Sequence, residues 1–288
     1  MDVLAIQLVN GLSYGFLLFI ITSGLSLVFG IMGVLNLAHG SMYMLGAYIA
    51  LSLLTKVIEN FWVAILLASV LVALVALVIE VGLLRPTYHL GHLSQVLLTF
   101  GLAYVFHDIA KLVWGTQVMS LPLPDYLQGS IQLFGQTFPI YRLTVIAIGV
   151  VVGLGLWFLQ EKTRYGAIIR AGLVDKEMVS GLGINIKLVF TCVFLFGGVL
   201  AGFGGGIAAP ILGIYPSMEF QTLILALVVL VIGGLGSFLG TFIASLLVGL
   251  LETFSKYFFP EVSLFIIFAL MAIVLVVKPN GLLGKKVV

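Results

Sequence analysis

The chain has 288 residues, of which 62% are hydrophobic and 8% are charged, and its formal net charge is +2. A soluble domain carries about 25% charged residues, so this chain lacks the polar side chains to cover a water-facing surface, and most of its exterior must face lipid. The small net charge and the lack of any basic run longer than Lys285-Lys286 argue against nucleic acid as a partner, and the single cysteine, Cys192, excludes a disulfide framework.

Apolar runs of about 20 residues recur along the chain, and such a run can cross a hydrocarbon core roughly 30 Å thick. We predict an all-α fold, a polytopic bundle of membrane-spanning helices that forms a single domain over residues 1–288. Nine spans are predicted, and eight or ten stay open because residues 219–256 are hard to divide. The predicted spans are 3–30, 41–58, 61–84, 93–113, 141–160, 188–209, 219–232, 238–256 and 261–277. The first run has no basic segment before it and no small-residue cleavage site, so we expect a retained span and not a signal peptide.

Two apolar runs are interrupted by glycines and polar residues. Irregular backbone cannot face lipid, and paired interruptions in a transporter point to its solute path. The alternative is that both are simple turns between helices. The stretches that follow them, 40–50 and 236–244, are weakly alike and hint at an internal repeat. Seven residues of the interruptions are predicted to line the path, and the polar lining among them would come from the asparagine, the histidine and the serine: Asn36, His39, Gly40, Gly233, Gly234, Gly236 and Ser237.

Residues 114–140 form a long polar connection with three prolines, Pro122, Pro124 and Pro139. We predict an excursion outside the membrane, which could take the form of a small hairpin over the mouth of the protein. It either connects two spans only or also touches a partner.

The Lys and Arg residues in the loops set the orientation, because basic residues concentrate on the cytoplasmic side. Nine fall on one side, namely Arg85, Lys162, Arg164, Arg170, Lys176, Lys187, Lys278, Lys285 and Lys286. Four fall on the other, namely Lys56, Lys111, Arg142 and Lys256. We therefore predict an external N-terminus and a cytoplasmic C-terminus.

The longest polar passage on the basic side covers residues 161–187. Residues 167–180 are predicted to form a short helix, which Gly181 or Gly183 would end because glycine adopts left-handed geometry at little cost. Such a helix is too short and too polar to span a membrane. It suits a groove on another protein.

This segment resembles the coupling loop of ABC-importer permeases, in particular that of the branched-chain amino acid permeases. The family pattern is roughly T-R-x-G-R-A-x-R-A, followed by D-x-x-x-A-x-x-x-G-I-N. The matching positions are Thr163, Arg164, Gly166, Arg170, Ala171, Asp175, Gly183, Ile184 and Asn185. Ala167 and Val179 depart from it, at an arginine and a small residue of the family, which could alter the grip on the partner. The resemblance assigns contact with the ATPase to Arg164, Arg170, Ala171, Asp175, Glu177, Gly181 and Gly183.

Other stretches resemble the same family across nearly the full chain. The segment from Asn10 to Gly40 is similar to its N-terminal signature, Arg85-Pro86 follows the third span, and residues 278–284 are similar to its C-terminal tail. The length favours the shorter, LivH-type member of the family's two paired permeases.

The resemblance implies several partners in a prokaryotic cytoplasmic (inner) membrane. They are a second, homologous permease, two cytoplasmic ATP-binding subunits and an external or periplasmic solute-binding protein. The sequence agrees with this division, because no phosphate-binding G-x-x-x-x-G-K-[ST] motif occurs and Gly284-Lys285-Lys286 is only a fragment of one. We expect no cofactor on this chain, because the partners would use the ATP and magnesium. We also expect no metal site and no catalytic residue. His89 and His92 are three residues apart and could bind a metal, but they have no acidic or cysteine neighbour.

Acidic residues in or near the spans can bind the proton or ion that drives a secondary transporter. Most have a structural explanation here: Glu252 lies four residues before Lys256, Asp108 three before Lys111, and Glu80 near Arg85, whereas Glu219 and Glu261 begin helices. The pairing disfavours an ion-coupled secondary transporter, and the lack of hydrolase motifs disfavours an intramembrane enzyme.

The resulting expectation is a permease subunit that imports branched-chain amino acids (Leu, Ile, Val) by alternating access driven by partner ATPases. Urea, short amides or another small polar solute remain alternatives for the same architecture.

Overall fold

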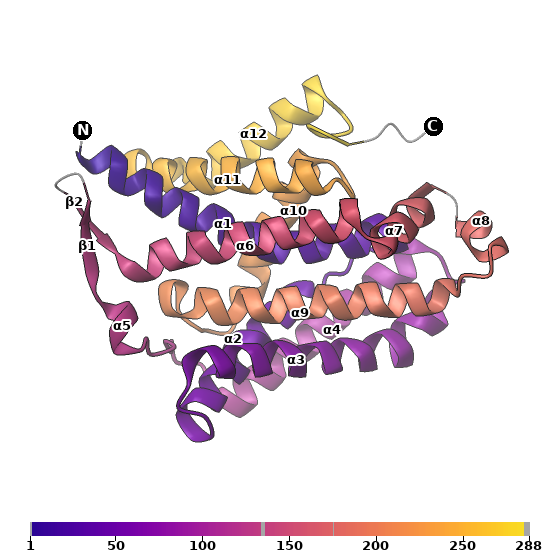
Figure 1. The fold of residues 1–288 in the computed structure, drawn as a ribbon, viewed down its shortest axis with the longest axis horizontal. Helices are drawn as coiled ribbons and strands as arrows, with labels where there is room; N and C mark the ends of the chain where they lie inside the picture. Colours follow the sequence, from indigo (N-terminus) through magenta and orange to yellow (C-terminus); the bar gives the residue numbers. More distant parts are fainter. Residues whose placement is uncertain (1, 134–135, 175, 285–288) are drawn as a thin grey trace.

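The computed structural model describes residues 2–133, 136–174 and 176–284 (Figure 1). All nine ranges predicted as spans are helical, so the predicted helical bundle is confirmed. The helices are α1 (Asp2–Met32), α2 (His39–Lys56), α3 (Phe61–Ile79), α4 (His92–Trp114), α6 (Ile140–Lys162), α9 (Ile186–Leu212), α10 (Met218–Gly233), α11 (Phe238–Phe258) and α12 (Ser263–Val277).

Seven helices in the described part of the chain are long and apolar enough to cross a membrane. The other two, α2 and α10, are mostly buried among their neighbours. The 16 residues of α10 cover only about 24 Å at 1.5 Å per residue. The two helices lie inside the bundle, and the number of complete crossings stays a prediction.

The shorter elements lie between and beyond these helices. α3 continues through a π-helical turn, η1 (Glu80–Leu84), and a 3-10 turn, η2 (Arg85–Thr87), and a second 3-10 turn, η3 (Pro260–Val262), precedes α12. The predicted excursion contains α5 (Asp125–Gln128) and an antiparallel pair of strands, β1 (Ser130–Leu133) and β2 (Gln136–Pro139). The hairpin considered for this segment is therefore present, and with an isolated β-bridge between Met119 and Ile214 it departs from the all-α description.

The polar passage on the basic side is also helical, but its boundaries differ from the prediction. α7 (Arg164–Val174) begins three residues before the predicted start at 167, and α8 (Lys176–Gly181) follows it. Residue 175 lies outside the described residues. The earlier start has a local cause, since the Thr163 hydroxyl accepts a hydrogen bond from the Gly166 amide (3.1 Å) and satisfies a donor of the first turn.

Side-chain caps explain where other helices begin. Asn60 accepts hydrogen bonds from the amides of Trp62 and Val63 at the start of α3, Asn185 caps α9, and Ser237 caps α11. Ser237 thereby divides the ambiguous range 219–256 into two helices.

The centre of the bundle depends on glycine at helix contacts. α2 and α9 approach so closely that a Cβ on Gly46 would overlap the backbone of Gly202, and one on Gly205 would overlap the carbonyl oxygen of Tyr43. Small residues allow such close packing, which drives helix association in lipid. Two helices that are more than 150 residues apart in the sequence thus pack directly against each other.

The long helices run roughly side by side, so that the molecule has two distinct ends (Figure 1). The N-terminus and the β1–β2 hairpin lie at one end, which we call the N-terminal end. The C-terminus, α7 and α8 lie at the opposite, C-terminal end. This separation positions the candidate sites.

Candidate functional site

The first interruption, residues 33–38 between α1 and α2, is buried inside the protein. The side chains of Asn36 and His39 are both about 1% exposed. The imidazole Nε2 of His39 donates to the carbonyl of Ile21 in the middle of α1 (3.0 Å), and Asn36 Oδ1 accepts from the amide of Ala38 (3.1 Å). The other polar atoms of these two side chains, Asn36 Nδ2 and His39 Nδ1, are buried without a hydrogen-bond partner among the described residues.

Neighbouring helices satisfy the backbone of this interruption. Thr99 of α4 accepts a hydrogen bond from the Leu37 amide (3.2 Å) and lies 3.4 Å from the Leu35 carbonyl. Gly40, in the first turn of α2, lies against the backbone of Glu219 in the first turn of α10, where no Cβ would fit. The interruption therefore avoids lipid, as irregular backbone must.

The second interruption, residues 234–237, lies at the other end of α10. Gly234 and Gly236 adopt positive φ values of 99° and 75°, which favour glycine. The C-terminal tail covers this turn, because the amides of Leu282 and Leu283 donate to the carbonyls of Ile232 (2.8 Å) and Gly233 (3.1 Å).

The structure thus separates the two groups of predicted path residues by the length of α10. Asn36, His39 and Gly40 lie beside its first half, and Gly233, Gly234, Gly236 and Ser237 lie at its last turn and beyond. Their role in translocation stays a prediction.

The structure also shows a buried hydrogen-bonded pair, His107 and Glu219, beside the first interruption. Nδ1 of His107 in α4 lies 2.5 Å from Oε1 of Glu219, and the Glu219 side chain is 1% exposed. Its Oε2 has no hydrogen-bond partner among the described residues. The sequence placed Glu219 correctly at a helix start, but 112 residues separate the two partners and no local pattern connects them.

The predicted coupling segment is fixed to the bundle through its first turn. A Cβ on Gly166 would overlap the carbonyl oxygen of Gln160, so α7 folds back tightly on the end of α6. Gly183 ends the segment with a φ of 81°, which confirms it as a predicted stop. Between these glycines, α7 and α8 extend from the C-terminal end of the bundle (Figure 1).

Much of this segment is open to solvent. Arg164, Ala171, Gly181 and Gly183 are exposed, and Arg170 is half-buried with its Nη1 3.5 Å from Oε2 of Glu161. Asp175 lies outside the described residues, as does the side chain of Glu177. Large apolar side chains are exposed on the same segment, with Tyr165 74% and Leu182 75% exposed. This is a surface suited to contact with another protein, and its role as the coupling site stays a prediction.

A buried network of charged and polar side chains lies at the same, C-terminal end of the molecule. Glu80, in the π-helical turn after α3, accepts hydrogen bonds from Arg85 (Nη2 to Oε2, 2.9 Å), from the hydroxyl of Tyr88 (2.9 Å) and from Thr191 of α9 (2.8 Å). Burial and the contact with Glu80 raise the pKa of the Tyr88 hydroxyl, which stays protonated as a donor. The network joins α3 to α9 and explains why Glu80 is tolerated without solvent.

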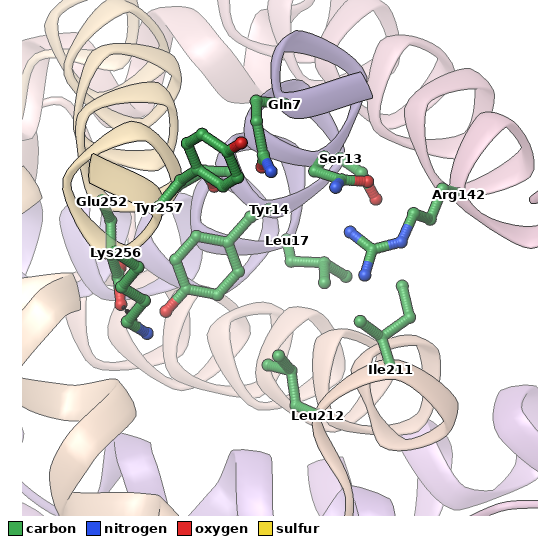
Figure 2. A pocket seen from close by; sticks show the side chains of 12 residues that line it. Gln7, Ser13, Tyr14, Leu17, Arg142, Ile211, Leu212, Glu252, Lys256 and Tyr257 are labelled. Atoms are coloured by element: carbon green, nitrogen blue, oxygen red, sulfur yellow. Dashed lines mark ion pairs between the residues drawn. The ribbon is translucent and has the colours of Figure 1, made fainter. Parts of the chain in front are cut away.

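At the N-terminal end, a cavity of about 400 Å³ opens between α1, α6, α9 and α11 (Figure 2). Polar side chains come from three of these helices, and the hydrophobic ones include Leu17 of α1 and Ile211 and Leu212 of α9. Arg142 of α6 points into it from the side opposite Glu252 and Lys256 of α11 (Figure 2).

The two charged groups of α11 form an ion pair, as their spacing predicted. Lys256 Nζ lies 2.6 Å from Glu252 Oε1; the lysine side chain is 61% exposed and the glutamate side chain 4%. The sequence did not reveal that Arg142 shares this cavity, because it precedes Glu252 by more than a hundred positions. Only the association of the helices brings them together.

The comparisons with known proteins agree with the resemblance drawn from the sequence. Residues 7–275 match the family model described as branched-chain amino acid transport system / permease component. The chain is 27% identical over 292 residues to the high-affinity branched-chain amino acid transport system permease protein LivH of Salmonella typhimurium, covering 97% of this chain and 95% of LivH. It is 29% identical over 296 residues to the corresponding permease protein BraD of Pseudomonas aeruginosa, with the same coverage of 97% and 95%.

A solved structure with a similar fold is PsaBC from Streptococcus pneumoniae in complex with Fab. It matches with a TM-score of 0.50 and 12% identity, over 91% of this chain and 87% of the other. At that identity the likeness concerns the fold alone. Because the family model covers almost all of the helical bundle, the chain belongs to the family of permease components of branched-chain amino acid transport systems.

Proposed function

We propose that this chain is the permease subunit of an ATP-driven importer that carries leucine, isoleucine and valine across the prokaryotic cytoplasmic membrane. The observation that carries the proposal is the family match over residues 7–275. The two relatives described above are permease proteins of high-affinity branched-chain amino acid transport. The chain itself then binds no nucleotide, and ATP is hydrolysed by its partners.

The proposed topology has nine crossings, with the N-terminus outside and the C-terminus in the cytoplasm. The distribution of Lys and Arg supports this orientation. The arrangement in Figure 1 also supports it, because an odd number of crossings requires the termini to lie at opposite ends. In this orientation α7 and α8 face the cytoplasm, and the β1–β2 hairpin and the cavity face outward.

In the proposed mechanism the complex contains this chain, a second homologous permease, two ATP-binding subunits and an external solute-binding protein. The ATPases press on α7 and α8 when they close on ATP. The tight turn at Gly166 transmits this force to α6, and the bundle alternates between outward and inward access. The buried interruptions beside α10 supply the irregular backbone that such a path uses.

Arg170 offers a test of the coupling surface, because the structure provides a matched control. Arg170→Gln is expected to lower ATP-driven transport by about tenfold while ATP hydrolysis continues, since a charged contact with the partner is lost. Glu161→Gln removes the same internal ion pair but leaves the arginine on the surface, and transport should change little. Both rates are measured in vesicles that contain the complete transporter. Equal effects of the two substitutions would show that Arg170 serves only the internal pair.

The proposed function is tested by reconstituting the chain with a second permease, two ATPases and a solute-binding protein of a branched-chain amino acid transport system. Radiolabelled leucine, isoleucine and valine should accumulate in the vesicles only when ATP is present. Unlabelled urea and acetamide should not compete. Import of urea or an amide in place of the three amino acids would contradict the proposed substrate.

The buried pair of His107 and Glu219 is the observation that most favours the alternative, an ion-coupled carrier, because protonatable groups inside a membrane often drive transport. The same vesicles separate the two mechanisms. Accumulation by this chain alone on a proton or sodium gradient would support the carrier and overturn ATP-driven import.

A further inference from the structure

The cavity at the N-terminal end has separate anionic, cationic and apolar walls, and the proposed function does not yet use it. Glu252 of α11 forms the anionic wall, Arg142 of α6 forms the cationic one, and Leu17, Ile211 and Leu212 supply apolar surface (Figure 2). A volume of about 400 Å³ lies at the small end of the range for small-molecule sites.

The anionic wall has hydrogen-bonding capacity that the protein does not use. The Glu252 residue is 3% exposed; Lys256 lies 2.6 Å from its Oε1, and the Tyr14 hydroxyl of α1 also interacts with this carboxylate. Its Oε2 is buried and has no hydrogen-bond partner among the described residues. The hydroxyl of Ser13, another lining residue that is 1% exposed, also lacks a partner there. Buried polar atoms are normally paired, so two orphaned acceptors in one small cavity indicate a ligand that donates hydrogen bonds.

The cationic wall also has hydrogen-bonding capacity that the protein does not use. Arg142 lines the cavity and makes no hydrogen bond or ion pair with the residues that the structure describes. Figure 2 shows its guanidinium group directed into the cavity, toward the Ser13 side of α1. A guanidinium group binds a carboxylate through two parallel hydrogen bonds, which makes it the usual choice for recognising that group.

One residue that lines the cavity, Leu17, lies near the first interruption along α1. Leu17 lies one helical turn before Ile21, whose carbonyl accepts the hydrogen bond from His39. A ligand that rests on Leu17 is therefore one turn of α1 away from the predicted path residues Asn36 and His39. This places the cavity at the mouth of the predicted path.

We propose that this cavity binds the head group of an aliphatic α-amino acid in its zwitterionic form. Arg142 binds the carboxylate, Glu252 Oε2 and the Ser13 hydroxyl accept from the ammonium group, and Leu17, Ile211 and Leu212 contact the side chain. The inference rests on the proposed function, and it gives that function a binding site on the permease itself.

The test uses the complex of the two permeases and their ATPases in lipid nanodiscs, without the solute-binding protein, and three ligands that differ only in the head group. Leucine carries both charges, leucinamide lacks the carboxylate, and 4-methylpentanoate lacks the ammonium group. Wild-type protein should bind radiolabelled leucine, and each analogue should compete about tenfold or more weakly than unlabelled leucine, because one charged contact is missing.

Substitutions then assign each charge to its residue. Arg142→Gln should weaken leucine binding about tenfold and abolish the preference for leucine over leucinamide, while the preference over 4-methylpentanoate remains. Glu252→Gln should also weaken leucine binding, but it should abolish the preference for leucine over 4-methylpentanoate while the preference over leucinamide remains. Lys111→Gln and Glu261→Gln remove an exposed charge of each sign at the same end of the molecule, and they should leave both preferences unchanged.

A loss of affinity that is the same for all three ligands would indicate a structural role for Arg142 and Glu252 and overturn the proposed site. If the wild-type transporter imports leucine into vesicles and both variants import it at the same rate, the proposed site is wrong and the proposed function stands. If instead the transporter imports no branched-chain amino acid but binds another zwitterion with the same dependence on Arg142 and Glu252, the site stands and the proposed substrate is wrong.

Discussion

Replacement of Glu80 by alanine is expected to lower the free energy of unfolding by about 3 kcal/mol or more, because it removes the acceptor of a buried charged network. Glu80 is fully buried and accepts from Arg85, Tyr88 and Thr191. Without it, the arginine loses its ionic partner, and Thr191 of α9 loses its hydrogen bond to the carboxylate. Unfolding of the purified chain in mixed micelles by added SDS, followed by tryptophan fluorescence, measures the difference.

Two further variants make this prediction specific. Glu80→Ala combined with Arg85→Ala should recover part of the loss, because no unpaired charge is then left behind. Asp108→Asn removes an acidic residue that is 71% exposed and 4.0 Å from Lys111, and it should change the free energy by no more than about 0.5 kcal/mol. If Glu80→Ala were as mild as Asp108→Asn, the network would not contribute to stability.

Replacement of Gly205 by alanine is expected to destabilise the protein by about 1–3 kcal/mol, since the new methyl group would overlap the backbone of α2. The Cβ would overlap the carbonyl oxygen of Tyr43 and lie 3.1 Å from the amide nitrogen of Ala47, and neither atom can rotate away. α2 must therefore move as a whole, and its first residues, His39 and Gly40, move with it. Leucine uptake should fall together with stability.

Gly155 on α6 provides the control for this substitution. A Cβ there meets nothing within 4 Å, so Gly155→Ala should cost no stability and can add up to about 1 kcal/mol from helix propensity. The same SDS unfolding measurement applies to both variants. A Gly205→Ala protein as stable as Gly155→Ala would show that α2 and α9 do not depend on this close approach.

The sequence was most informative where a feature depends on neighbouring residues. Apolar runs predicted every helix of the bundle, because backbone in lipid must satisfy its own hydrogen bonds. The four-residue spacing of Glu252 and Lys256 predicted their ion pair, and Gly183 predicted the end of the α7–α8 segment. The start of α7 was placed three residues late, because the capping contact between Thr163 and Gly166 gave a weaker signal than the helical pattern.

Local patterns by themselves determined that this chain is a helical membrane bundle with interrupted apolar runs and a polar segment suited to a partner, and the resemblance in its motifs indicated the family. Tertiary structure alone decided which distant residues meet. It joined His107 to Glu219, Glu80 to Thr191, and Arg142 to the cavity of Glu252. Such pairs depend on which helices touch and at what rotation, and that is set by the packing of small residues along whole helices, which the spacing of neighbouring residues does not encode.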